Sequence, residues 1–70
     1  MKAEYITLDL IERLDLKRMR IKAGLSVSNV EEFINVTKSK IINAESGKKV
    51  EKQIVEKLIK KYKLFINSRD

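Results

Sequence analysis

The chain has no cysteine, no histidine and no proline, and only two of its 70 residues are glycine. The absence of cysteine excludes disulfide bonds and thiolate chemistry. Because histidine is absent too, a structural zinc site would have only carboxylate ligands, which such sites rarely use. The sequence also lacks a signal-like N-terminus and a long apolar run. We therefore expect a cytoplasmic protein with no membrane contact and no cofactor.

Enzymatic activity is not expected either. The chain has no Gly-rich phosphate-binding loop, and the adjacent Glu31 and Glu32 would point to different sides of a helix. A domain of this size also offers little room for a catalytic cleft. We therefore expect no small-molecule substrate.

Positive charge is abundant and unevenly spread. The formal net charge is +6, with −2 in residues 1–16, +4 in residues 17–25, −2 in residues 26–37 and +6 in residues 38–63. Folding can gather the basic blocks into one patch, and such a patch attracts a polyanion by releasing its counterions. A chain this short also buries only a small core, so we expect a homodimer as a source of extra stability.

Apolar residues at helical spacing predict one all-α domain with four helices. We expect the helices at about residues 9–23, 26–35, 37–46 and 51–62. Gly24 and Gly47 follow the first and third helices, where a left-handed residue commonly ends a helix. The fourth helix can extend beyond Tyr62.

Side chains that cap helices mark the predicted starts. Asp9 and Glu12 have the spacing of a capping box, Ser26 or Ser28 caps the second helix, and Thr37 caps the third. Residues 1–8 form an N-terminal arm whose residues 3–8 are a short strand, an extended segment or an early helical turn. Residues 63–70 form a tail that extends the last helix or makes a strand with a second copy.

The segment between residues 25 and 47 carries a helix-turn-helix pattern. Its characteristic positions are Leu25, Ser26, Val30, Ile34, Asn35, Val36, Thr37, Ile41, Glu45 and Gly47, with Leu16, Met19 and Arg20 upstream. In this pattern the chain resembles the lambda-repressor-like, Cro/C1-type (XRE) helix-turn-helix family over about residues 14–50. The resemblance implies a compact four-helix DNA-binding domain, with the helix at about 37–46 in the major groove of an operator.

The resemblance also implies roles for individual residues. An ion pair between Arg20 and Glu45 would hold the first helix to the end of the third. The residues expected to contact bases are Lys38, Ser39, Ile42 and Asn43. The residues expected to contact phosphates are Ser28, Asn29, Lys40, Ser46, Lys48 and Lys49. We also expect Phe65 and Ile66 in the tail to form the dimer contact.

We therefore expect a sequence-specific transcriptional regulator of phage or mobile-element type that binds double-stranded DNA as a homodimer. Four positions depart from the family pattern, namely Val27, Glu31, Phe33 and Ile42. Glu31 replaces a small residue and would have to bend outward, toward Lys38 or Lys40. These departures favour an alternative, a protein-binding module such as an antirepressor or antitoxin with little DNA binding. A third hypothesis is an accessory factor that bends DNA with little sequence preference.

Overall fold

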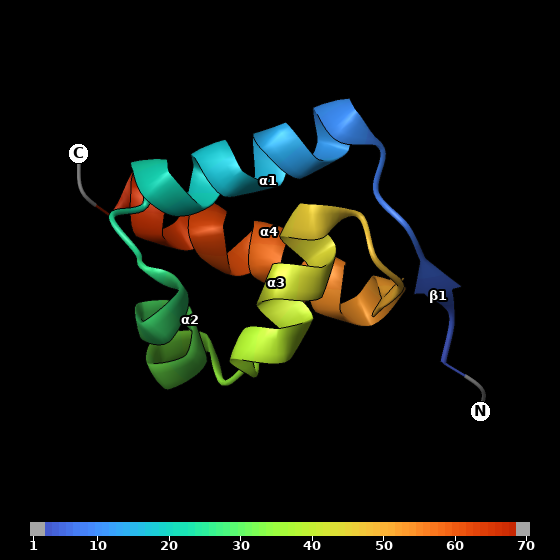
Figure 1. Cartoon of the computed structure of the whole chain (residues 1–70). Helices are drawn as coiled ribbons and strands as arrows, with labels where there is room; N and C mark the ends of the chain where they lie inside the picture. The colour runs from blue at the N-terminus through green and yellow to red at the C-terminus, as the bar shows by residue number, and fades with distance from the viewer. Residues whose placement is uncertain (1–2, 69–70) are drawn as a thin grey trace.

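Four helices and a small two-stranded sheet make up the computed structural model, which describes residues 3–68 (Figure 1). In chain order the elements are β1 (Tyr5–Ile6), α1 (Leu10–Lys22), α2 (Val27–Ile34), α3 (Lys38–Ser46), β2 (Val50–Glu51) and α4 (Lys52–Asn67). The four predicted helices are confirmed. The all-α prediction is wrong in one respect, because it did not include the sheet.

Local capping explains where the helices begin. Asp9 precedes α1 and forms a capping box with Glu12, in which the Glu12 N–H donates to the Asp9 carboxylate at 2.8 Å. Ser26 is the cap of α2 and pairs with Asn29 in the same reciprocal way. Of the two serines predicted as caps for this helix, the structure therefore uses Ser26.

Left-handed residues follow three of the helices, and the first is Gly24 after α1, with φ 78°. Asn35 follows α2 with φ 63° and reverses the chain toward α3, and Gly47 follows α3 with φ 80°. A Cβ atom at Gly47 would also lie 3.1 Å from the Cδ atom of Arg13, so that side chain would have to shift slightly. Both residue types are those that adopt this backbone region at low cost.

The sheet joins the N-terminal segment to the segment between α3 and α4. β1 and β2 are antiparallel, with Tyr5 opposite Glu51 and Ile6 opposite Val50. The Lys52 N–H adds a hydrogen bond of 2.8 Å to the Glu4 carbonyl oxygen. Residues 3–8, for which the sequence allowed three conformations, therefore include a short strand that lies beside the segment after α3.

The last helix is longer than the minimum that the sequence predicted. α4 continues through residues 63–67, so this part of the tail extends the helix and does not form a strand. The outermost residues of the predicted arm and tail, 1–2 and 69–70, lie outside the described residues. None of the helices described within residues 3–68 is both long enough and apolar enough to cross a bilayer.

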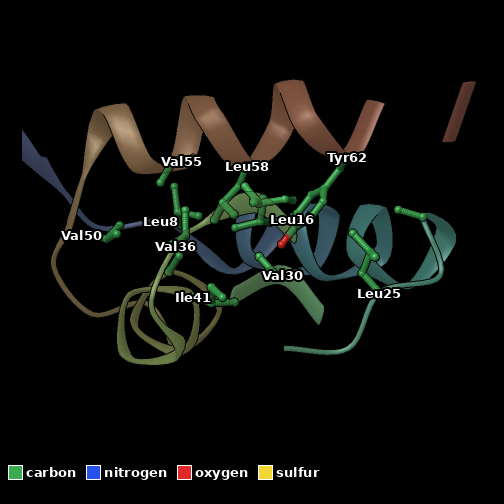
Figure 2. Packing of buried hydrophobic residues seen from close by; sticks show 13 residues of the cluster. Leu8, Leu16, Leu25, Val30, Val36, Ile41, Val50, Val55, Leu58 and Tyr62 are labelled. Carbon is green, nitrogen blue, oxygen red and sulfur yellow. The ribbon is translucent and has the colours of Figure 1, made fainter. Parts of the chain in front are cut away.

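One hydrophobic core lies between α1, α4 and the α2–α3 pair (Figure 2). Val30, Ile41, Leu58 and Tyr62 are its largest fully buried side chains. α1 packs against both α3 and α4, and α2 packs against α3. In Figure 1, α1 lies along one edge of the molecule, and α2 and α3 lie on the side away from its outer surface. The core therefore leaves one side of α3 and one side of α1 uncovered.

Candidate nucleic-acid interface

α2 and α3 are joined by three residues, 35–37, and pack tightly against each other. Asn35 supplies the left-handed turn, and the next residue, Val36, is buried. Val30 and Ile34 of α2 and Ile41 of α3 are buried in the shared core. α2 and α3 are thus two short helices held against each other across a tight turn, an arrangement that leaves one side of α3 uncovered.

The uncovered side of α3 carries the residues that the sequence predicted to contact bases. Lys38, Ser39 and Ile42 are exposed, and Asn43 is partly exposed beside them. Ile41 and Ala44 point to the opposite side and are fully buried. The helical period of 3.6 residues accounts for this division of α3 into an inner and an outer side. The structure thus brings all four predicted base-contacting side chains to one surface.

Glu31 of α2 caps the start of α3. The Glu31 carboxylate accepts a hydrogen bond of 3.0 Å from the backbone N–H of Lys38, the first residue of α3. Thr37, the residue at the N-cap position, makes no side-chain capping bond within the described residues. Glu31 therefore does bend toward Lys38, as the sequence allowed, although its partner is the backbone and not the side chain. A negative charge lies at the positive end of the α3 dipole as a result.

The lysines predicted to contact phosphates flank α3. Lys48 and Lys49 are exposed just after the helix. The Lys40 ammonium group lies 3.8 Å from the Glu51 carboxylate, and its side chain is about half exposed. An exposed pair at this distance is weak, so a phosphate can compete for Lys40. These three residues place positive charge beside α3 and on the segment that follows it.

Hydroxyl and amide groups differ in how free they are to bind phosphate. The Ser46 hydroxyl donates to the Ile42 carbonyl oxygen at 2.7 Å, so its proton is already used within α3. Ser28 is exposed near the start of α2. The carbonyl oxygen of the Asn29 side chain accepts from the Ser26 N–H, which leaves its NH₂ group as the part that can donate to a phosphate. Ser46 is thus the least suited of the three.

Arg20 and Glu45 form a paired contact between α1 and α3. The Arg20 Nε and Nη2 atoms lie 2.7 Å and 3.1 Å from the two Glu45 carboxylate oxygens, and Arg20 Nη1 donates to the Leu25 carbonyl oxygen at 3.0 Å. The side chains of this pair are only 11% and 12% exposed. The hydrogen bond that Arg20 donates to Glu45 raises the pKa of the Arg20 guanidinium. This pair, which the sequence predicted, ties α1 to the end of α3 and to the chain entering α2.

Tyr62 of α4 is fully buried in the core near this pair, and Figure 2 shows its oxygen atom within the core. Its hydroxyl group has no hydrogen-bond partner among residues 3–68. Burial raises the pKa of the Tyr62 hydroxyl well above its ordinary value, and the nearby Glu45 carboxylate adds to the rise. The hydroxyl is therefore a cost to stability that the ring's packing offsets.

Tyr5 is a surface residue that no sequence pattern singled out. Its exposed side chain lines a shallow hollow with Lys40, Asn43 and Lys49, at the edge of the outer side of α3. The pairing of β1 with β2 brings it there. A two-residue strand leaves almost no periodic signal, and its partner lies far along the chain, between α3 and α4. Only the possibility of a strand at residues 3–8 pointed in this direction.

Phe65 and Ile66, the residues predicted to form the dimer contact, are half-buried and pack against the core of their own chain. The Phe65 ring also contacts Phe33 of α2, with ring centroids 6.4 Å apart. Of the apolar residues at this end of α4, Leu64 is the one that is largely exposed. The structure therefore uses Phe65 mainly to join α2 to α4.

No protein-family model matches the chain, and neither curated proteins nor solved structures give a match. What the molecule does must therefore be inferred from the surface that its residues form.

Proposed function

We propose that the protein is a sequence-specific DNA-binding regulator of the lambda-repressor-like, Cro type, which places α3 in the major groove of an operator. The observation that carries this proposal is the outer side of α3. It presents Lys38, Ser39, Ile42 and Asn43 together, on a helix that α2 and the Arg20–Glu45 pair hold in place. A regulator of this size acts by occluding the site of polymerase or of a competing protein.

The chemistry of these side chains suits the edges of base pairs. α3 has 9 residues, which corresponds to a length of about 14 Å, and a groove about 12 Å wide accepts one such helix. A lysine such as Lys38 donates to the O6 and N7 atoms of guanine, and an asparagine such as Asn43 pairs with the N6 and N7 edge of adenine. Ile42, which is 52% exposed, offers an apolar contact for a thymine methyl group.

Charge around α3 supports binding to the DNA backbone. Lys40, Lys48 and Lys49 lie where phosphates would flank the inserted helix, and the chain as a whole carries a net charge of +6. Contacts of this kind release counterions, so the affinity should fall steeply with salt. The same charge would speed the encounter with DNA. As a homodimer, the protein would read two half-sites about 10 bp apart.

A second function is favoured by two observations on α2. Glu31 places a carboxylate at the start of α3, where it repels phosphates, and Phe33 remains 58% exposed. An antirepressor-like module that binds another protein would tolerate both features. Such a module would bind a protein partner with little dependence on salt and would bind duplex DNA weakly or not at all.

Selection of bound sequences from random duplex DNA tests the proposed function. We expect a short palindromic motif, and binding to it should weaken about tenfold or more for Asn43→Ala. Lys57→Ala, an exposed change on α4 away from α3, is the matched control and should leave binding within about twofold of the original. No enrichment of any motif, together with salt-insensitive binding to a protein, would instead support the second function.

A further inference from the structure

The outer side of α1 carries a row of exposed apolar side chains. Leu10, Ile11, Leu14 and Ile21 are 60%, 71%, 43% and 59% exposed. At helical spacing these residues share the side of α1 opposite the buried Leu16. Four large apolar residues on one helix of a 70-residue chain form a patch of the kind that marks an interaction surface.

This surface is separate from the candidate DNA interface. α1 faces α3 through Arg13 and Arg20, which contact Ser46 and Glu45, and its outer side points away from both. Figure 1 shows α1 along one edge of the molecule with its outer side uncovered. None of the residues expected to contact bases or phosphates belongs to α1. The outer side of α1 can therefore be covered while α3 lies in a groove.

The charge along α1 indicates what covers it. Without Arg13 and Arg20, which face α3, residues 9–15 carry three negative charges and residues 17–22 carry three positive charges. If two copies of α1 lie antiparallel, the acidic half of each meets the basic half of the other, and their helix dipoles oppose favourably as well. In this arrangement Leu10 faces Ile21 of the second copy, and Leu14 lies near the two-fold axis. Asp15 and Arg18 form an exposed, weak pair 3.9 Å apart within one chain, so Asp15 can turn to Arg18 of the other chain. A parallel pair would instead place like charges together.

We propose that a second copy of this chain docks on the outer side of α1, so that two α1 helices pack antiparallel about a two-fold axis. The interface is self-complementary, as an isologous dimer requires. The apolar row supplies most of the affinity, and the exposed charges set the direction. Because α1 has 13 residues, and is thus about 20 Å long, the pair buries less than the roughly 1,200 Å² of a standard interface. The dimer is therefore weak, with a dissociation constant in the micromolar range.

This inference rests on the proposed function, because it assigns an interface to the proposed homodimer. Its test uses protein without DNA, so a failure of the α1 interface can be distinguished from a failure of DNA binding. Sedimentation equilibrium of the full chain at physiological ionic strength should show a monomer of 8.2 kDa in equilibrium with a species of twice that mass. Leu14→Lys should weaken the association about tenfold or more. Leu64→Lys, at a residue of α4 that is 55% exposed, is the matched control and should leave the association unchanged.

Charge reversal and crosslinking test the antiparallel direction. Asp15→Lys and Arg18→Glu should each weaken the dimer, and the double variant should restore it, because the pair between the chains is then re-formed with opposite signs. Since the chain has no cysteine, single cysteines give unambiguous crosslinks. Leu14→Cys should form a disulfide-linked dimer on oxidation, whereas Leu10→Cys, at the end of α1, should not.

Three results would overturn the inference. The first is a chain that stays monomeric up to millimolar concentration. The second is a dimer that Leu64→Lys disrupts and Leu14→Lys does not, which would move the interface to the end of α4. The third is crosslinking through both cysteine variants, which would mean a parallel pair. The circular dichroism of each variant confirms that the exposed substitutions leave the helices folded.

Discussion

The carboxylate of Glu31 accepts the backbone N–H of Lys38 at 3.0 Å, so an acidic residue of α2 caps the helix proposed to enter DNA. The first N–H groups of a helix attract anions, and in α3 a side chain of the protein already occupies one of them. The capping bond stabilises the arrangement of α2 and α3. The same carboxylate repels a DNA phosphate. The contact therefore stabilises the fold but lowers the affinity for DNA.

Replacing Glu31 should therefore separate these two effects. Glu31→Gln keeps an oxygen that can accept from Lys38 but removes the charge, so we expect duplex DNA to bind roughly two- to fivefold more tightly at low salt. Unfolding free energy should fall by about 0.5–1 kcal/mol, because the neutral cap is weaker. Titration of labelled DNA and urea denaturation measure the two quantities. Glu32→Gln, an exposed change one residue away, is the control, and an equal gain in affinity there would show that only net charge matters.

Arg20→Ala should destabilise the whole domain. Glu45 is only 12% exposed, and the substitution takes away its guanidinium partner. It also removes the donor to the Leu25 carbonyl oxygen. We expect a loss of about 2 kcal/mol or more, and hence a melting temperature lower by about 10 °C. The double variant Arg20→Ala/Glu45→Ala should lose less than the sum of the two single changes. An unchanged melting temperature in Arg20→Ala would mean that the pair contributes little to holding α1 against α3.

Tyr62→Phe should stabilise the protein. The hydroxyl of Tyr62 is fully buried and has no partner among residues 3–68, so its removal relieves a desolvation cost while the ring keeps its packing. We expect a gain of about 1 kcal/mol in unfolding free energy, measured by urea denaturation at neutral pH. Tyr5→Phe, at an exposed tyrosine, is the control and should change stability little. A loss of stability in Tyr62→Phe would indicate that the hydroxyl is hydrogen-bonded in solution.

The same residue makes stability depend on alkaline pH. Burial raises the pKa of Tyr62 above its ordinary value of 10.0, so the folded state keeps the proton in a range where the unfolded state releases it. The unfolded state then binds fewer protons, and stability falls as pH rises above about 10, by up to about 1.4 kcal/mol per pH unit. The Tyr62→Phe variant has no hydroxyl at this position, so its stability does not show this fall at alkaline pH. The advantage of the variant over the original chain should therefore grow between pH 9 and pH 11, and parallel pH profiles for the two proteins would contradict this assignment.

Local signals explain which parts of the fold the sequence predicted. Asp9 with Glu12, Asn35 and Gly47 mark helix ends through their own backbone and capping chemistry, and the structure has all of these boundaries within a residue or so. The sheet was only one of several possibilities, because two residues pair with two others from a distant part of the chain. The capping contact of Glu31 was also beyond prediction in detail, since it depends on how closely α2 approaches the start of α3.

The candidate interface was predictable to a similar degree. The positions of Lys38, Ser39 and Ile42 on one side follow from the helical period once α3 is recognised. The hydrogen bond that occupies the Ser46 hydroxyl does not follow from it. Neither does the half-burial of Phe65 against the core, because the helical pattern left open whether α4 continues past Tyr62.

Tyr5 provides a test of the hollow beside α3, which the sequence did not single out as part of the candidate interface. Its exposed side chain lines the same hollow as Lys40 and Lys49, so a phosphate held by these lysines would lie within reach of its hydroxyl. Tyr5→Phe should weaken binding to the selected DNA motif by about 0.5–1 kcal/mol, and Tyr5→Ala by somewhat more if the ring also contacts the sugar. Thr7→Ala, an exposed change two residues further on that lies outside the hollow, is the control. Because the phenol carries no positive charge, the slope of affinity against salt should stay the same in both Tyr5 variants, whereas Lys49→Ala should reduce that slope by about one. Unchanged affinity in both variants would place the DNA backbone away from β1.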